Sequence, residues 1–174
     1  MQEVSVRIRF SRPCLGACMR REKRRVTFVF ERDAAQRILF LPGRWTALFV
    51  RAARLANQCH SLVRSIAWCP TIVGTPRSDD FPRKTSATAT GNRTVTLTYL
   101  HEQFGPGDTA DIMAELPDGM SLENFRELLS LVGKHWGFSP FGTTTDRFGT
   151  FDVVTVQPRR RQRQLDTEVT TVKN

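Results

Sequence analysis

In the stretch RILFLPGRWTALFVRAARLA (residues 37–56) the pattern of apolar residues changes from that of a strand to that of a helix. Its first part, RILFLPG (37–43), is a short apolar run that ends in Pro42-Gly43, a pair that stops an extended segment. From Arg44 onward the apolar residues recur with the spacing of one helix face. They are Trp45, Leu48, Phe49, Ala52, Leu55 and Ala56. The stretch therefore predicts a short strand, a turn and an amphipathic helix.

The sequence before this stretch predicts two strands. In EVSVRIRFS (3–11) the residues Val4, Val6, Ile8 and Phe10 alternate with Ser5, Arg7 and Arg9, which is typical of a half-buried strand. VTFVFER (26–32) reads as a second strand. Between them, Arg20, Arg21, Lys23, Arg24 and Arg25 place five positive charges within six residues, a density that predicts a loop or an exposed edge.

Downstream, three further strands and one helix are predicted. The second half of LVRSIAWCPTIVG (62–74), RTVTLTYLHEQF (93–104) and TADIMAELP (109–117) read as strands, whereas the turn-rich segment 75–92 between the first two predicts a long loop or insertion. In DGMSLENFRELLSLVGKH (118–135), Ser121 is the expected N-cap of a helix that ends at Gly133 or Gly137. TFDVVTVQP (150–158) is the last strand.

In chain order these elements predict an α+β protein with a ferredoxin-like βαββαβ fold. Two helices would cover one face of an antiparallel sheet, a β-hairpin insertion would precede the first helix, and the other sheet face would stay open for a partner. The length of 174 residues suits one domain, which we expect to span residues 1–158. Residues 159–174 predict a flexible, basic, polar tail.

The positive charge of the chain is unevenly distributed. The net charge is +9, and residues 1–64 hold 14 Lys and Arg against four Asp and Glu. A field concentrated in this way attracts polyanions, of which nucleic acid is the commonest. The alternative interpretation is a solvated basic surface without a partner.

Several other classes of function have no sequence signal. The four cysteines match no zinc spacing, and Cys14, Cys18 and His60 alone do not complete a metal site, so we expect no metal and no cofactor. The chain has no membrane-spanning run and no signal-peptide pattern, which together with reduced thiols predicts a cytoplasmic protein. It also has no P-loop, G-x-S-x-G or H-E-x-x-H motif.

Three of these features together resemble the RAMP superfamily, the CRISPR-associated RNA-binding proteins built on ferredoxin-like domains. The first is the N-terminal strand with its basic loop. The second is ILFLPGRWTALFVRAA (38–53), in which Pro42, Gly43 and Arg51 match the family's turn and first helix. The third is DRFGTFDVV (146–154), in which Gly149 and Phe151 match its glycine-rich loop and last strand. The resemblance implies RNA binding, assembly of copies side by side along a strand, and a role in antiviral defence. We expect the chain to be a divergent or phage-borne relative of this family.

The glycine-rich segment GFSPFGTTTDRFGTFDVV (137–154) predicts a phosphate cradle, because glycine lets backbone amides approach an anion closely. Phenylalanines in it could stack on bases; the alternative is a mobile connector whose phenylalanines fill the core. The full set of candidate nucleic-acid-binding residues is Arg7, Arg9, Arg20, Arg21, Lys23, Arg24, Arg25, Arg44, Arg51, Gly137, Phe138, Gly142, Arg147, Phe148 and Gly149.

These observations predict a non-catalytic protein that binds single-stranded RNA or DNA, RNA being favoured, and that forms homo-oligomers or joins a nucleoprotein complex. One alternative is an endoribonuclease of the same fold, with His135 as general base. The other is a phage or mobile-element assembly protein whose open sheet binds another protein.

Overall fold

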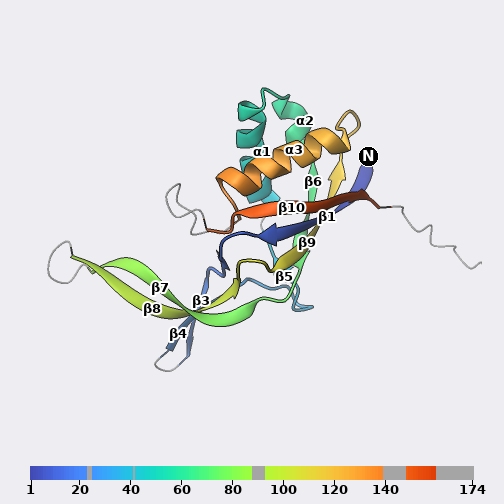
Figure 1. Ribbon diagram of the computed structural model, residues 1–174. Helices are drawn as coiled ribbons and strands as arrows, with labels where there is room; N and C mark the ends of the chain where they lie inside the picture. Colours follow the sequence, from blue (N-terminus) through green and yellow to red (C-terminus); the bar gives the residue numbers. More distant parts are fainter. Residues whose placement is uncertain (23–24, 41, 88–92, 139–147, 160–174) are drawn as a thin grey trace, which may run out of the picture.

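The computed structural model describes residues 1–22, 25–40, 42–87, 93–138 and 148–159, and an antiparallel five-stranded sheet forms its centre (Figure 1). The strand order is β10-β1-β9-β6-β5, and every neighbouring pair is antiparallel. The five strands are β1 (Gln2–Phe10), β5 (Ile38–Leu39), β6 (Ala67–Val73), β9 (Thr109–Leu116) and β10 (Phe151–Pro158).

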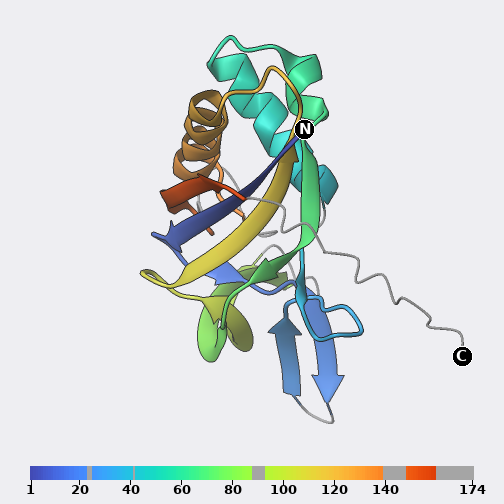
Figure 2. The same ribbon diagram turned by 90° about the vertical axis from the view of Figure 1, so that its right-hand side faces the viewer.

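Three helices cover one face of this sheet: α1 (Pro42–Leu55), α2 (His60–Arg64) and α3 (Leu122–His135) (Figure 2). The sequence predicted α1 and α3 but not the five-residue helix α2, so the prediction of two helices is corrected to three in the described chain. Within the residues that the structure describes, no helix has the length and apolar character needed to cross a membrane. The prediction of an α+β protein is confirmed.

The ends of α3 follow from two residues of the sequence. Ser121 is the N-cap as predicted, and its hydroxyl oxygen accepts a hydrogen bond of 3.1 Å from the Asn124 N–H. At the other end, Gly137 follows the last turn with φ +66°, a left-handed conformation that favours glycine. Gly133, the alternative stop, lies inside the helix, so that part of the prediction is wrong.

The core between the helices and the sheet is aromatic. Trp45 of α1 and Trp68 of β6 stack at a ring-centroid distance of 4.5 Å, and Phe49 and Phe125 pack against Trp68. The predicted inner face of β1 is confirmed, because Val4, Val6, Ile8 and Phe10 are all buried.

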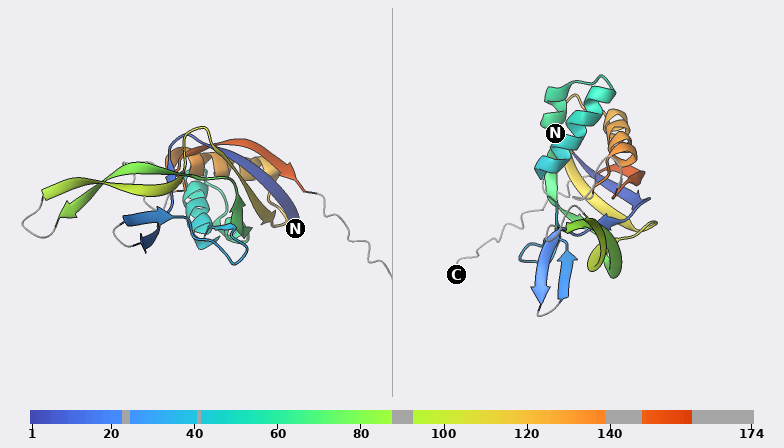
Figure 3. Two further views of the ribbon diagram at one scale, coloured as in Figure 1. Left: turned by 90° about the horizontal axis from the view of Figure 1, so that it is seen from below. Right: turned by 90° about the vertical axis from the view of Figure 1, so that its left-hand side faces the viewer.

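A second sheet projects from the end of the molecule away from the helices (Figure 3). Four of its strands lie in the order β2-β8-β4-β3, and the fifth, β7, also pairs with β8. It contains two hairpins that diverge from a shared base, one formed by β3 and β4 and one by β7 and β8. The strands are β2 (Cys14–Leu15), β3 (Cys18–Glu22), β4 (Arg25–Val29), β7 (Arg77–Ala87) and β8 (Arg93–Phe104).

The predicted loop 75–92 is largely a strand. Residues 77–87 form β7, which pairs with β8 from Arg77↔Gln103 to Ala87↔Arg93, while 88–92 lie outside the described residues. The segment has little apolar content because a projecting ribbon has no core to face, so the alternation that signals a buried strand is missing. Pro82 is also tolerated, since β7 lies at an edge and needs no partner on its outer side.

Candidate nucleic-acid interface

The basic cluster lies on the hairpin formed by β3 and β4. β3 is an edge strand, so the predicted exposed edge is confirmed, and the pairs Arg21↔Val26 and Glu22↔Arg25 place Arg21 and Arg25 at the same end of the hairpin. Arg20 and Arg21 are exposed. Arg25 begins β4, and Lys23 and Arg24 lie outside the described residues. The hairpin therefore carries its charge away from the body of the protein.

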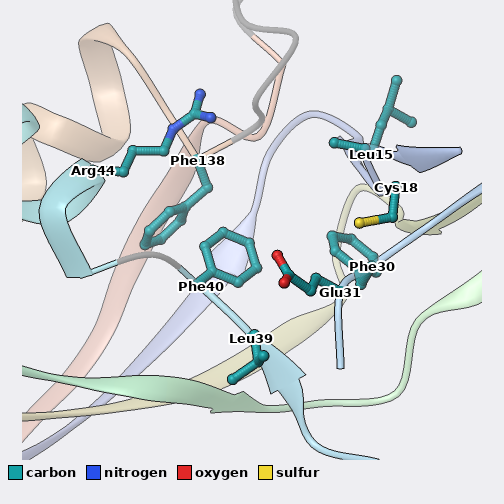
Figure 4. A pocket seen from close by; sticks show the side chains of 9 residues that line it. Leu15, Cys18, Phe30, Glu31, Leu39, Phe40, Arg44 and Phe138 are labelled. Atoms are coloured by element: carbon teal, nitrogen blue, oxygen red, sulfur yellow. The ribbon is translucent and has the colours of Figure 1, made fainter. Parts of the chain in front are cut away.

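A pocket of about 110 Å³ lies between the base of this hairpin and the start of α1 (Figure 4). Its floor is formed by aromatic and aliphatic side chains, and its polar groups come from separate parts of the chain. The lining residues are Leu15, Ala17, Cys18, Phe30, Glu31, Leu39, Phe40, Arg44 and Phe138.

Arg44 supplies the positive charge of this pocket. It is the third residue of α1 and is half-buried, and burial lowers the pKa of its guanidinium, an effect that nearby Cys14 partly offsets. The first turn of α1 contains no acidic residue. Because the N-terminal end of a helix is itself partly positive, Arg44 and the helix end together favour an anion at this place.

Cys14 is the buried neighbour of Arg44. Burial raises the pKa of its thiol to about 12, although the charge of Arg44 acts in the opposite direction. The thiol therefore stays protonated near neutral pH and contributes packing rather than reactivity. Among the described residues, no group of three or more His, Cys, Asp or Glu side chains is arranged to hold a metal ion.

Residues 139–147 of the glycine-rich segment, including Gly142 and Arg147, lie outside the described residues. The flanking residues, 137–138 and 149–150, are held in place by backbone hydrogen bonds. The N–H of Phe138 donates to the Gly149 carbonyl at 2.9 Å, and the N–H of Gly149 donates to the Pro13 carbonyl at 2.7 Å. The N–H of Gly137 donates to the Val132 carbonyl at 2.9 Å. The prediction of a phosphate cradle is therefore wrong for Gly137 and Gly149, whose amides are used within the fold.

Phe138 is a core residue. Only 2% of it is exposed, and its ring packs against Phe40, Trp45 and Phe151 at centroid distances of 5.2, 3.6 and 4.9 Å. The prediction that it stacks on bases is corrected, because it offers a pocket floor instead of an open ring face. Phe148 is half-buried.

A second hollow, of about 560 Å³, is lined by α3, the start of β10 and the residues that follow β1, and includes two basic side chains. Its polar lining combines Arg12 and Lys134 with hydroxyl groups and the carboxylate of Asp152. The N–H groups of Ser11 and Arg12 both donate to the Thr150 carbonyl, at 2.9 and 3.3 Å. Arg12 and Lys134 were not among the predicted binding residues. The pairing of β1 with β10 brings Arg12 beside the glycine-rich segment, whereas Lys134 lies shortly before that segment in the sequence.

Three predicted arginines lie apart from the hairpin. Arg7 and Arg9 are on the open sheet face, where Arg7 donates hydrogen bonds of 2.7 and 2.9 Å to Asp111. Glu3 and Arg159 form another ion pair there, at 3.5 Å. Arg51 is exposed on α1, and no ion pair joins it to Glu31 in the described part of the chain. The open face is thus mixed in charge instead of basic.

His135, the candidate general base, is exposed at the C-terminal end of α3. Its ring lies 5.6 Å from that of Trp136, centroid to centroid. It does not line the pocket beside the basic hairpin.

The sequence matches no protein-family model, and no curated protein matches it. The residues brought together by the fold therefore carry the functional argument.

Proposed function

We propose that this protein binds single-stranded nucleic acid, with RNA favoured, without cleaving it. The observation that carries the proposal is the projecting β3–β4 hairpin, on which Arg20 and Arg21 are exposed and whose base borders a pocket lined by Arg44. Lys23, Arg24 and Arg25 follow them in the sequence, and a phosphate backbone would run along this hairpin. Contacts of this kind give sequence-independent affinity that falls as salt releases the counterions.

The arrangement of the central sheet supports a ferredoxin-like core. Read as β1, α1, β6, β9, α3 and β10, the elements follow the βαββαβ order, and the strand order β10-β1-β9-β6 interleaves the two halves as such a fold requires. This supports a distant relation to the RAMP superfamily, as do Pro42-Gly43 at the start of α1 and Phe151 at the start of β10. The four free cysteines support a cytoplasmic setting.

The test is a titration of fluorescent single-stranded RNA and DNA of several lengths at low and moderate salt. The proposal predicts binding at low salt that weakens strongly at higher salt, with RNA bound at least as tightly as DNA. If neither the RNA nor the DNA binds at low salt, the proposal is contradicted. Affinity for a protein partner that does not change with salt would instead favour an assembly role.

The same reactions, followed over time on a denaturing gel, separate binding from cleavage. The proposal predicts intact RNA with the wild type and with His135→Ala. RNA fragments that form with the wild type and disappear with His135→Ala would establish the endoribonuclease alternative. A titration of protein against one strand length also gives the number of copies bound per strand, which tests the proposal that copies assemble side by side.

A further inference from the structure

The pocket at the base of the hairpin contains a carboxylate that phosphate binding alone does not explain. Glu31 is exposed and lines the pocket together with Arg44, and no ion pair holds its side chain within the described part of the chain. Figure 4 shows its carboxylate turned toward the ring of Phe40. A negative charge at this position repels a phosphate backbone, so an ionised carboxylate here suits a ligand that offers hydrogen-bond donors.

The backbone around Glu31 is fixed, which gives the carboxylate a defined position. The carbonyl of Glu31 accepts a hydrogen bond of 2.7 Å from Leu39, and Phe40 donates one of 2.6 Å to Pro70 of β6. The neighbouring Arg32 is paired with Glu102 of β8. The walls of the pocket are thus tied to both sheets before any ligand binds.

Size and lining favour one flat ring. The volume of about 110 Å³ lies well below the roughly 300–1,000 Å³ of pockets that hold drug-sized ligands. The floor includes the edges of Phe30, Phe40 and Phe138, all of them buried. Single-stranded RNA is recognised through bases that leave the stack, pack on apolar side chains and present their Watson–Crick edge.

Among the four bases, guanine alone presents two adjacent donors, N1–H and N2–H, on that edge. The two oxygens of one carboxylate can accept both, whereas the other bases present one donor beside an acceptor that a carboxylate repels. Building on the proposed function, we propose that this pocket receives one unstacked guanine of the bound strand, with Glu31 accepting from N1–H and N2–H. Arg44 and the start of α1 then face the phosphate of that nucleotide.

The alkylation rate of Cys18 measures whether a ligand occupies the pocket. Its side chain lines the pocket and is exposed, and Cys59, which precedes α2, is an exposed thiol elsewhere and serves as the internal control. Hydrogen bonds from Ser61 and nearby backbone amides lower the pKa of the Cys59 thiol, so it reacts readily. Alkylation is followed by peptide mass spectrometry with three strands: oligouridine, oligouridine with one central guanosine, and the same strand with inosine, which lacks the N2 amine.

The guanosine strand is expected to bind tenfold or more tightly than the oligouridine and inosine strands, the range of one good bidentate base contact. It should slow the alkylation of Cys18 but not that of Cys59. Glu31→Gln replaces one acceptor by a donor and should abolish the guanosine preference. Asp33→Asn removes the same charge from a side chain that binds Arg37 instead of lining the pocket, and should keep the preference.

The outcomes separate this inference from the proposed function. If no strand binds at low salt, the proposed function fails. If all strands bind equally, if the preference survives in Glu31→Gln, or if all strands protect Cys18 to the same degree, the guanine pocket is overturned while binding to single strands stands.

Discussion

The guanidinium of Arg32 and the carboxylate of Glu102 form a bidentate ion pair that fixes the segment following β4 to β8. Arg32 Nη1 donates to Glu102 Oε2 at 2.7 Å, and Nη2 bonds to Oε1. The same carboxylate accepts a hydrogen bond of 2.8 Å from the Phe30 backbone N–H. Both side chains are largely buried, with 20% and 13% exposed. The pair holds the base of the basic hairpin beside the pocket.

Replacing Glu102 by glutamine should destabilise the protein. The change removes the charge from a carboxylate that accepts hydrogen bonds from a guanidinium and a backbone amide, and the expected loss is about 1–2 kcal/mol in the free energy of unfolding. Urea denaturation measures it. Asp33→Asn is the matched control and should cost clearly less, because the arginine of its ion pair, Arg37, is 64% exposed. Equal losses in the two variants would show that the Glu102 contact has no special weight.

The same pair predicts how stability depends on pH. Burial acts to raise the pKa of Glu102, but hydrogen bonds from Arg32 and the Phe30 N–H outweigh it and hold the pKa below its usual 4.5. Its stabilising contribution is therefore complete above about pH 4.5 and is lost as the pH falls through the lower value of the folded state. The difference in unfolding free energy between wild type and Glu102→Gln should shrink between pH 6.5 and pH 3. A difference that stays constant over this range contradicts the assignment.

Gly137 should be intolerant of substitution. Its φ is +66°, and an added Cβ would lie 2.4 Å from the Thr150 nitrogen. Gly137→Ala is therefore expected to destabilise by at least 1–2 kcal/mol, through both backbone strain and a clash with main chain. Gly43→Ala is the control, because no atom lies within 4 Å of its added Cβ. Thermal unfolding of both variants should show a large drop for Gly137→Ala and no drop for Gly43→Ala, which replaces a glycine within α1.

Arg7 should contribute little to binding of single strands. Its guanidinium donates hydrogen bonds to Asp111, which raise the pKa of Arg7 and keep it charged, and the carboxylate of Asp111 offsets that charge on the open sheet face. Arg7→Gln is expected to change the affinity for single-stranded RNA by less than twofold in a fluorescence titration. A loss as large as that caused by removing Arg20 would place the strand on the open face instead.

Some elements of the fold can be predicted from local sequence patterns, and others cannot. The alternation from Val4 to Phe10 and the stripe that begins at Trp45 predicted β1 and α1 because each pattern reports a buried face. The strand β7 gave no such signal, since its pairing with β8 does not depend on an apolar face. The roles of Gly137 and Gly149 could also not be predicted from the sequence, because their backbone amides bond to residues that only the fold brings near them.

The candidate site shows the same division. The cluster from Arg20 to Arg25 was found by charge density alone, and its exposure follows from the cost of burying so many charges. The pocket could not be found in this way, because Cys18, Glu31, Arg44 and Phe138 come from four separate segments that only the folded chain brings together. Arg12 was missed for the same reason.

The most direct test of the central claim is the salt dependence of RNA affinity in variants that remove equal charge from two places. For single strands, each phosphate contact contributes roughly 0.7 to the slope of log affinity against log salt. Arg20→Gln/Arg21→Gln should therefore reduce the magnitude of the slope by about 1.4, whereas Arg51→Gln/Arg54→Gln, on the exposed surface of α1, should leave it close to that of the wild type. Equal reductions by the two double variants, or no reduction by the first, would contradict a strand bound along the β3–β4 hairpin.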